Sequence, residues 1–223
     1  MISIIIPVYN EEKIIRESLT NLSYGNNIEV IVVDGGSHDK TVELAKQYPV
    51  KVIKCMKNRA FQMNEGARQA KGGIFLFLHA DCILEKGSLE KIKERLGNGF
   101  IGGCFSHKIR SDRIIYRCIE ASGNVRASLF RIFYGDQAIF VRRDTFFEIG
   151  GFAKVDLFED VIFSQRLKNK GKTCILDKGV YASARRWERQ GLIKATLINW
   201  LLSLGFIVGM PPEKLNKIYY DLR

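Results

Sequence analysis

The sequence predicts an α/β fold with a mostly parallel central sheet flanked by helices. Two apolar runs, Glu29–Val33 and Ile74–Leu78, have the composition of strands buried on both faces, as in parallel sheets. Such strands alternate with segments of helical periodicity, which indicates a doubly wound arrangement with right-handed crossovers. The chain has 223 residues and 46% hydrophobic residues, enough for one good core. We expect one α/β domain over residues 1–190 and a helical extension over residues 191–223.

The elements of the first half follow one another in the order β-α-β-α-β-α-β. Ile2–Ile6 is predicted as the first strand, and a helix from Glu12 to about Leu22 follows it with Asn10 as its N-cap. The remaining predictions here are helices at Lys40–Gln47 and from about Arg59 to Lys71, and strands at Val50–Ile53 and at the two apolar runs.

The second half continues with mixed elements and ends in helices. Predicted strands cover Phe100–Ile109, Gln137–Val141 and Cys174–Leu176. Predicted helices cover Gly87–Leu96, Asp112–Phe133, Arg143–Ile149, Val161–Lys170, Leu192–Met210 and the residues after Pro212.

Charge and cysteine usage narrow the class of protein. The formal net charge of +11 favours anionic partners such as nucleotides, nucleic acid or an acidic membrane surface. Five scattered cysteines without a CxxC pair argue against a disulfide framework or a zinc site and favour a reducing compartment. The opening residues MISIIIPVYNEE lack a basic segment, so they predict a strand and not a signal peptide. We expect a cytoplasmic location, including the inner face of the cell membrane.

Acidic residues follow two of the predicted strands. Asp34 comes directly after Glu29–Val33, and Asp81 follows Ile74–Leu78 after two residues. Because open α/β sheets bind ligands at the carboxyl ends of their strands, this pair predicts one acidic site. A carboxylate there suits Mg²⁺ or Mn²⁺, since one protein carboxylate plus a diphosphate can hold such an ion. The alternative is that Asp81 only caps the following turn.

A second acidic pair, Glu159 and Asp160, opens a predicted helix. A helix N-terminus favours a carboxylate, and a carboxylate there can serve as a general base. Helix capping is the alternative interpretation. Arg59, Arg186 and Trp187 lie in segments that could bring cationic groups to a phosphate, although a solvated basic surface explains these arginines equally well.

Taken in order, these segments resemble the family 2 glycosyltransferases, which have a GT-A fold. The matching segments are IIIPVYNEE, VVDGGSHDKT, NRAFQMNEGARQAKGGIFLFLHAD, GDQAIFVRRDTFFEIGGF and the triplet Phe158-Glu159-Asp160. Their order and spacing match from about Ile2 to Trp187. The combination LHAD, GDQ and ARRW further resembles a small soluble bacterial branch of that family.

The resemblance implies an inverting transfer of a sugar from a nucleotide-diphospho-sugar, of UDP or GDP type, to an acceptor hydroxyl. Asp81 would hold Mg²⁺ or Mn²⁺ and Asp160, next to Glu159, would deprotonate the acceptor. The implied nucleotide-binding residues are Pro7, Tyr9, Glu11, Asp34, Arg59 and Ala80. The residues implied for the donor sugar or acceptor are Gly135, Asp136, Gln137, Arg186 and Trp187.

The chain departs from the family pattern at two places. The usual DxD is His79-Ala80-Asp81, and Ser183 stands where processive enzymes have the glutamine of QxxRW, so polymerisation is not supported. The missing carboxylate motivates an alternative, a catalytically inactive nucleotide-sugar-binding relative. A nucleic-acid-binding module is disfavoured, because basic and aromatic residues are not interleaved in a recognisable motif. We therefore expect no nucleic-acid partner.

The apolar segment Leu192–Met210 leaves three alternatives open. It could pack on the domain or a partner, lie in a membrane interface, or form a short span near the lower end of the roughly 17–25 residue range. The positive charge is compatible with peripheral contact with an anionic membrane, and a lipid-linked acceptor would then be expected.

Overall fold

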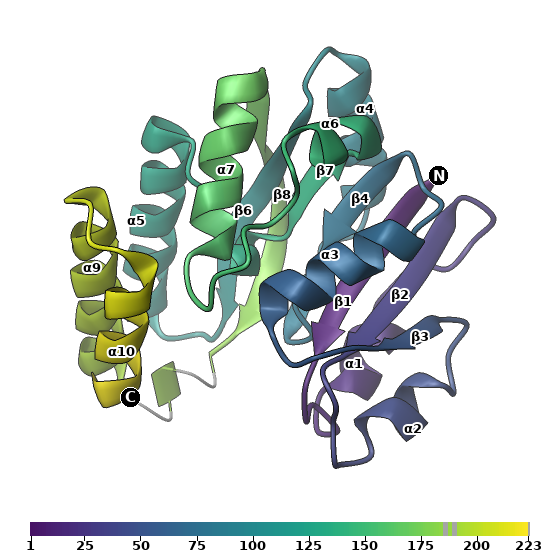
Figure 1. Cartoon of the computed structure of the whole chain (residues 1–223), viewed down its shortest axis with the longest axis horizontal. Helices are drawn as coiled ribbons and strands as arrows, with labels where there is room; N and C mark the ends of the chain where they lie inside the picture. The colour runs from purple at the N-terminus through teal and green to yellow at the C-terminus, as the bar shows by residue number, and fades with distance from the viewer. Residues whose placement is uncertain (185–186, 189–190, 223) are drawn as a thin grey trace.

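The structure is a computed structural model that describes residues 1–184, 187–188 and 191–222. Within these residues the strands form an eight-stranded sheet in the order β3-β2-β1-β4-β7-β6-β8-β5, with helices on both faces (Figure 1). The strands are β1 (Ile2–Val8), β2 (Ile28–Asp34), β3 (Lys51–Lys54), β4 (Ile74–Phe77), β5 (Cys82–Leu84), β6 (Gly102–Arg110), β7 (Ile139–Arg142) and β8 (Thr173–Ser183). The helices are α1 (Ile15–Thr20), α2 (Thr41–Ala45), α3 (Arg59–Gln69), α4 (Ser88–Gly97), α5 (Ile114–Phe130), α6 (Arg143–Glu148), α7 (Glu159–Lys170), α9 (Leu192–Ile207) and α10 (Pro212–Leu222), with a 3₁₀ turn η1 (Gly135–Gln137).

The half of the sheet formed by β3, β2, β1 and β4 is parallel. Ile5 of β1 is in register with Ile31 of β2 and Phe77 of β4, so these strands end at one edge. The predicted α/β fold is confirmed, and the sheet as a whole is mixed. Strand β7 runs antiparallel to β4 and β6, whereas β8 is parallel to β6 and antiparallel to β5. The loop that follows β4 therefore lies beside η1, which precedes the antiparallel β7.

Two apolar layers cover the sheet. On β1, the side chains of Ile4 and Ile6 join the layer that includes Leu19 of α1 and Ile92 of α4. Ile5 points to the opposite layer, which is built from α3, α6 and α7. The alternation follows from the strand period of two, and burial on both faces explains why β1 is almost uniformly apolar.

Strands β5 and β8 differ from the predictions. The segment Cys82–Leu84, which was not predicted as a strand, pairs with the end of β8. β8 extends from Thr173 to Ser183 instead of ending at Leu176, and a register shift between Phe105 and Ser106 accommodates it against β6. The polar pair Asp177-Lys178 interrupts the apolar pattern at this irregularity. For this reason the strand predicted from the pattern ended at Leu176, before the end of β8.

The predicted N-cap role of Asn10 is also wrong. Helix α1 starts only at Ile15 and has no side-chain cap. Asn10 has φ of 53°, and its Oδ1 accepts a hydrogen bond from the backbone N–H of His38 at 2.9 Å. Asparagine tolerates this left-handed conformation, so the residue links two loops at the sheet edge instead of starting a helix.

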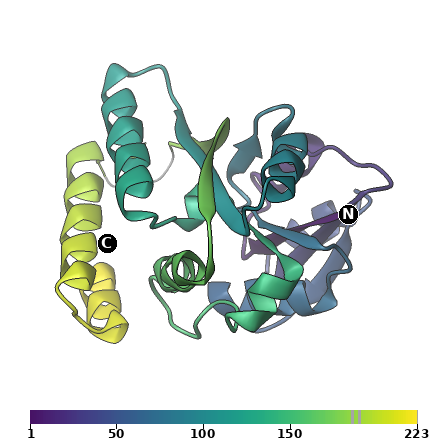
Figure 2. The same cartoon turned by 90° about the horizontal axis from the view of Figure 1, so that it is seen from above.

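The C-terminal helices pack against the domain near the start of α7. Ile198 and Leu202 of α9 and Leu215 of α10 form a buried cluster with Phe158 and Val161. Figure 2 shows α9 beside α5 at the end of the molecule away from β2 and β3, and Figure 1 shows the same neighbours. Among the helices described, none is long and apolar enough to cross a membrane.

Candidate active site

The loops after β1 and β2 are linked at the carboxyl edge of the sheet. The backbone N–H of Glu11 donates to Thr41 Oγ1 at 2.7 Å, and that of Asn10 donates to Ser37 Oγ at 2.9 Å. Tyr9 lies partly exposed on this edge, with Lys57 Nζ 3.8 Å from the centre of its ring. Pro7 and Glu11 are also partly exposed. The structure thus brings these three predicted residues to one edge.

Asp34 ends β2 and organises its own loop. Its side chain is only 1% exposed, and its carboxylate accepts hydrogen bonds from the backbone N–H groups of Gly36 and Ser37 at 3.2 and 3.0 Å. Gly36 has φ of 87°, which favours glycine. A fixed, buried carboxylate therefore lies under the loop at the carboxyl end of β2, the edge at which open α/β sheets bind ligands.

Arg59 starts α3 and faces the second acidic pair. Asn58 caps this helix by accepting from the N–H of Phe61. Arg59 Nη1 lies 3.3 Å from Glu159 Oε1; the arginine side chain is half exposed and that of Glu159 is 3% exposed. An arginine that pairs with a buried carboxylate and keeps exposed surface can also contact a bound anion.

Asp160 lies at the N-terminus of α7, directly across from η1. Its Oδ2 accepts a 2.6 Å hydrogen bond from the N–H of Gly135, and its Oδ1 accepts from the N–H of Val161 at 2.7 Å. Burial, and then the neighbouring charge of Glu159, raise the pKa of Asp160 to about 7. A carboxylate with a pKa near neutrality is suited to exchange a proton with a hydroxyl.

The approach to Asp160 is held by an unusual backbone conformation. Phe158 has φ of 66°, in the left-handed region that a bulky residue rarely adopts. Its ring packs on Phe206, with the ring centres 4.9 Å apart. The strained turn therefore places two consecutive carboxylates at the start of one helix.

His79 occupies the space beside η1. A Cβ on Gly135 would lie 2.6 Å from His79 Nε2, so only glycine allows the two to approach this closely. Burial, and then the charge of Arg59, lower the pKa of His79 to about 4, which leaves the imidazole neutral at pH 7. The absence of the first carboxylate of a DxD is thus explained locally, since the histidine fills a packed position.

Cys82 lies between Asp81 and Asp136 and contacts both residues. Cys82 Sγ lies 3.8 Å from Asp81 Oδ1 and 3.8 Å from the backbone oxygen of Asp136. Burial and then the two aspartate charges raise the pKa of the Cys82 thiol well above its usual value.

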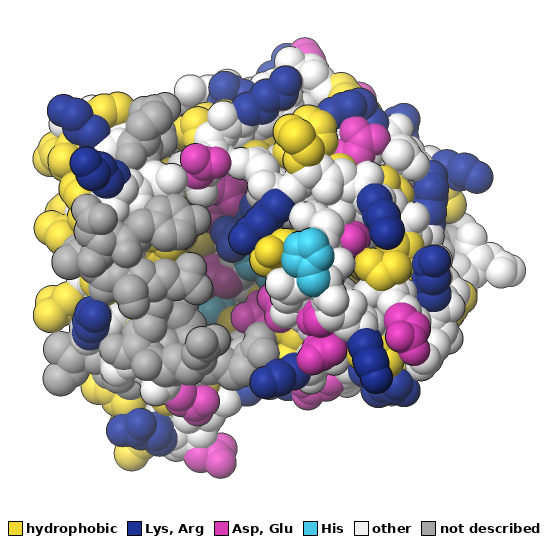
Figure 3. All heavy atoms as spheres, turned by 60° about the horizontal axis from the view of Figure 1, so that its bottom comes forward, with side chains coloured by type: hydrophobic (Ala, Val, Ile, Leu, Met, Phe, Trp, Pro, Cys, Tyr) yellow, Lys and Arg dark blue, Asp and Glu magenta, His cyan; other side chains and the backbone are white. Residues whose placement is uncertain are grey.

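With the edge turned forward, Figure 3 shows acidic side chains in a hollow near the middle of this face, with lysines and arginines around it.

The oxygen donors present at this edge fit a magnesium or manganese ion only as a partial site. Within the described ranges, no three His, Cys, Asp or Glu side chains gather closely enough to hold a metal. Asp81 is partly exposed and supplies a hard oxygen ligand, as these ions prefer. Diphosphate oxygens and water would have to complete the coordination.

The remaining predicted residues lie along η1 and beyond β8. Gln137 is 1% exposed and its Oε1 accepts from the N–H of Tyr134 at 3.1 Å, while the side chain of Asp136 is 44% exposed. Ala80 is buried under the strand end. Trp187 is 7% exposed and packs against Tyr116 and His107. Arg186 lies outside the residues described.

Sequence reasoning missed two parts of this region. His107 of β6 lies 3.6 Å from Asp136, but the residue is a single histidine in a strand, which gives no pattern to find. Asp156 accepts from Asn58 at 3.0 Å and from Asn216 of α10 at 3.4 Å, so the C-terminal helix reaches the rim of the site. The latter contact joins positions 60 residues apart and has no local signal.

These features place an acidic cluster at the carboxyl ends of the strands of an open α/β sheet, the edge where such sheets bind ligands, with a candidate base opposite the strand ends. The chain belongs to glycosyl transferase family 2, whose family model matches residues 3–159. The resemblance noted in the sequence is therefore confirmed, both for the family and for the fold.

Several curated proteins are similar to part of the chain. A dolichol-phosphate mannosyltransferase of Pyrococcus furiosus is 35% identical over 107 residues, which cover 44% of this chain and 30% of the relative. Glycosyltransferase AglE of Haloferax volcanii is 36% identical and covers 40% and 33% of the two chains. An undecaprenyl-phosphate 4-deoxy-4-formamido-L-arabinose transferase of Pseudomonas aeruginosa is 29% identical and covers 45% and 33%. The matches thus span about a third of these relatives.

Solved structures share the fold at lower identity. S. aureus TarS superposes with a TM-score of 0.66 and 21% identity, covering 89% of this chain and 40% of TarS. The TarS fragment 1–349 in complex with UDP-GlcNAc superposes with a TM-score of 0.66 and 20% identity, and the match covers 82% of this chain and 58% of the fragment. At this identity the likeness establishes the fold, which is the GT-A arrangement.

Proposed function

We propose that the chain transfers a sugar from a nucleotide-diphospho-sugar to an acceptor hydroxyl, with inversion at the anomeric carbon. The observation that carries the proposal is the Asp160 carboxylate, with a pKa of about 7, held by Gly135 across from the end of β4. Family membership supports it, as does the UDP-GlcNAc that a structure of similar fold binds.

The donor would lie along the parallel half of the edge. Asp34 and the loop residues Pro7, Tyr9 and Glu11 would surround the nucleoside, with Ala80 beneath it. Arg59 would face the diphosphate with its exposed surface while Glu159 holds its other side. Asp81 would hold Mg²⁺ or Mn²⁺, which would neutralise charge on the diphosphate when bound.

Asp160 would act on the acceptor. In its deprotonated form the carboxylate accepts the proton of the attacking hydroxyl, and the acceptor oxygen bonds to the anomeric carbon as the bond to the diphosphate breaks. Attack opposite the leaving group inverts that carbon. Glu159 would remain paired with Arg59 and keep the pKa of Asp160 high. Gly135, Asp136, Gln137, Arg186 and Trp187 would surround the donor sugar or acceptor.

The experiment that tests the donor site is a thermal-shift panel. UDP, GDP, CDP and dTDP would each be added with and without Mn²⁺ to the wild type and to Asp81→Ala. We expect one nucleotide to raise the melting temperature only with metal, and the effect to vanish in Asp81→Ala, because binding to the native state alone stabilises it.

The panel, together with an assay of sugar transfer and donor hydrolysis by the wild type and Asp160→Asn, separates the catalytic proposal from its alternative. A shift with no transfer or donor hydrolysis dependent on Asp160 would indicate the inactive nucleotide-sugar-binding relative, which the histidine in place of the first DxD carboxylate motivates. No shift with any nucleotide would contradict both. The matched control is Asp144→Ala, since Asp144 lies on α6 and its carboxylate accepts a local hydrogen bond from the N–H of Thr145.

We also propose that the acceptor is lipid-linked and that the protein contacts an anionic membrane peripherally. Similar proteins are named for dolichol-phosphate and undecaprenyl-phosphate chemistry. Helices α5 and α9 expose large apolar residues at their surface, which suits an interfacial helix pair. They include Val125, Leu129, Phe130, Leu197, Leu201 and Leu204.

A further inference from the structure

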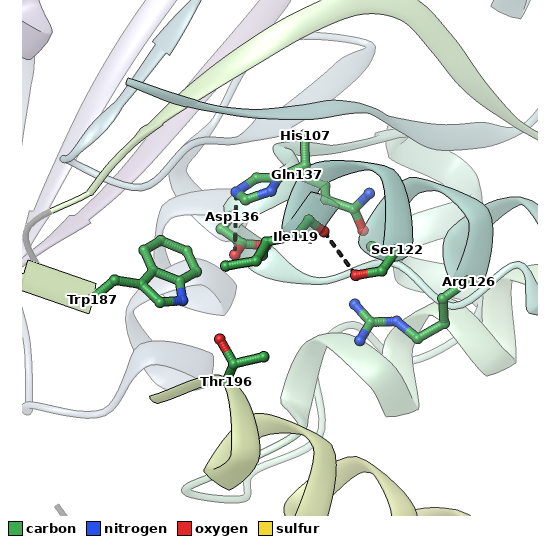
Figure 4. Close-up of a pocket in the computed structure, with 9 residues that line it drawn as sticks. His107, Ile119, Ser122, Arg126, Asp136, Gln137, Trp187 and Thr196 are labelled. Carbon is green, nitrogen blue, oxygen red and sulfur yellow. Dashed lines mark hydrogen bonds and ion pairs between the residues drawn. The ribbon is translucent and has the colours of Figure 1, made fainter. Parts of the chain in front are cut away.

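A small polar pocket lies on the far side of η1 from Asp160. Its volume is about 80 Å³, enough for several waters or one compact polar group. The N–H of Gly135 binds Asp160, and the next two residues, Asp136 and Gln137, line the pocket. Figure 4 shows residues of α5, η1 and α9 facing this space from different sides. One short turn therefore separates the candidate base from the pocket.

Buried polar atoms converge on this space without a hydrogen-bond partner. Nine such side-chain atoms occur among the residues that the structure describes, and five belong to residues lining this pocket. They are Arg126 Nε, Gln137 Nε2, Trp187 Nε1, Thr196 Oγ1 and His107 Nε2, the last of which lies 3.6 Å from Asp136 Oδ2, beyond hydrogen-bond distance. Because each buried unpaired group costs free energy, their concentration in one place points to a ligand that pairs with them.

The chemistry of these groups indicates what that ligand offers. Gln137 Oε1 already accepts from Tyr134, which turns its Nε2 donor away. The indole of Trp187 and the guanidinium of Arg126 only donate. The ligand must therefore supply acceptors, and the charge of Arg126 favours a negative one.

Packing holds two of the donors in place. The guanidinium of Arg126 lies 4.0 Å from the centre of the Tyr134 ring, and the Trp187 ring packs edge-on against Tyr116 at 6.1 Å. Such groups lose little freedom on binding, so the pocket is preorganised.

We propose that this pocket binds an oxyanion, a phosphate or a carboxylate, carried by the acceptor. The inference rests on the proposed function, because the anion would orient the acceptor's hydroxyl toward Asp160 across η1. Asp136 is the one carboxylate among the residues that line the described pocket, and it lies 3.6 Å from His107. Its charge offsets that of Arg126, so removing it strengthens anion binding.

Fluorescence of Trp187 tests the proposal. The chain has two tryptophans, so a Trp200→Phe background leaves Trp187 as the only reporter. Inorganic phosphate and acetate would be titrated in turn, with chloride holding the ionic strength constant. We expect Arg126→Met to weaken binding of the responding anion about tenfold, as for the loss of a charged hydrogen bond. Asp136→Asn should strengthen it, and Arg113→Met, an exposed arginine before α5, should change nothing.

Further titrations with Asp81→Ala, with glycerol phosphate and with vesicles containing phosphatidic acid decide between the possible outcomes. Asp81→Ala must keep the response, and its loss there would place the phosphate in the donor site and overturn the proposal. Equal affinities in Arg126→Met and Arg113→Met, or weaker binding in Asp136→Asn, would also overturn it. Comparing the binding of glycerol phosphate with that of vesicles containing phosphatidic acid distinguishes a soluble anionic acceptor from a lipid one. The nucleotide panel is independent, so failure of either proposal leaves the other result readable.

Discussion

Asp160 shows how one side chain obtains its chemistry from its neighbours. Two backbone N–H groups and Arg59 stabilise its carboxylate, yet burial and Glu159 outweigh them and raise its pKa to about 7. Removal from water disfavours the charged form, and a like charge next to it adds to that effect. The residue is therefore half deprotonated near neutral pH, where a base is most effective.

This environment predicts a pH-dependent activity. Only the deprotonated carboxylate accepts a proton, so kcat/KM for sugar transfer should rise about tenfold per pH unit below pH 7 and level off above it. Glu159→Gln removes the like charge, lowers the pKa of Asp160 and should move this limb to lower pH. Asp160→Asn should reduce the rate by roughly 10²–10⁴-fold.

A pH–rate profile of the three proteins checks this prediction. Glu148→Gln is the matched control, because Glu148 is an exposed carboxylate that pairs with Lys170 on the outside of the domain. The assignment of Asp160 as the titrating group would be contradicted if the acidic limb of the profile stayed in place in Glu159→Gln. It would also be contradicted if the limb moved by the same amount in Glu148→Gln.

The positions of the acidic residues of the candidate site could be predicted from sequence because each follows a pattern. Asp34 and Asp81 follow buried strands, and Glu159-Asp160 opens a helix. His107 and Arg126 could not, because their roles depend on the packing of β6 against α5. The left-handed conformation of Phe158 was likewise invisible, since nothing in a phenylalanine predicts positive φ.

At the scale of elements, the parallel half was predictable and the antiparallel half less so. Helix α7 begins at Glu159 and ends at Lys170 as expected, because acidic residues open it and Gly171 follows it. β5 is three residues long, too short to show a period, and its pairing with β8 is set by the rest of the sheet. Strand ends that depend on a distant partner have no local signal.

Two glycines inside helices predict opposite effects on stability. A Cβ on Gly66 of α3 would lie 2.4 Å from Ile5 Cγ2 and 3.0 Å from Val33 Cγ2, so Gly66→Ala forces the helix away from the sheet. A Cβ on Gly123 of α5 meets nothing within 4 Å. Alanine favours a helix by about 1 kcal/mol, whereas overpacking costs about 1–3 kcal/mol.

We expect Gly66→Ala to lower the free energy of unfolding by up to about 2 kcal/mol, the overpacking cost less the gain in helix propensity. Gly123→Ala should raise it by up to about 1 kcal/mol. Urea denaturation followed by circular dichroism measures both. Stabilisation by Gly66→Ala would show that α3 is not seated on β1 and β2 as described.

At the scale of the whole molecule, charge and exposed apolar surface occur together. The chain has a net charge of +11, and α9 exposes Leu197 and Leu201 by 63% and 54%. The next residue after each of these leucines lies on the inward face of the same helix, where Ile198 and Leu202 are buried in a cluster with Phe158. Helix α9 therefore packs on the domain, which was one of the alternatives that the sequence left open, and it also presents leucines outward.

This arrangement predicts binding to anionic vesicles. Wild-type protein should sediment with vesicles rich in an acidic phospholipid and much less with neutral ones, and salt should weaken the binding through screening. The double substitution Leu197→Glu with Leu201→Glu should weaken it about tenfold or more, because about 1 kcal/mol of burial is lost at each position and negative charge is added. Met56→Glu is the matched control, since Met56 is 69% exposed in the loop between β3 and α3. Equal loss of binding in both variants would show that net charge alone drives the interaction. If the wild type did not sediment with vesicles, the proposed membrane contact would be contradicted, whereas the proposed transfer reaction at Asp160 would not be affected.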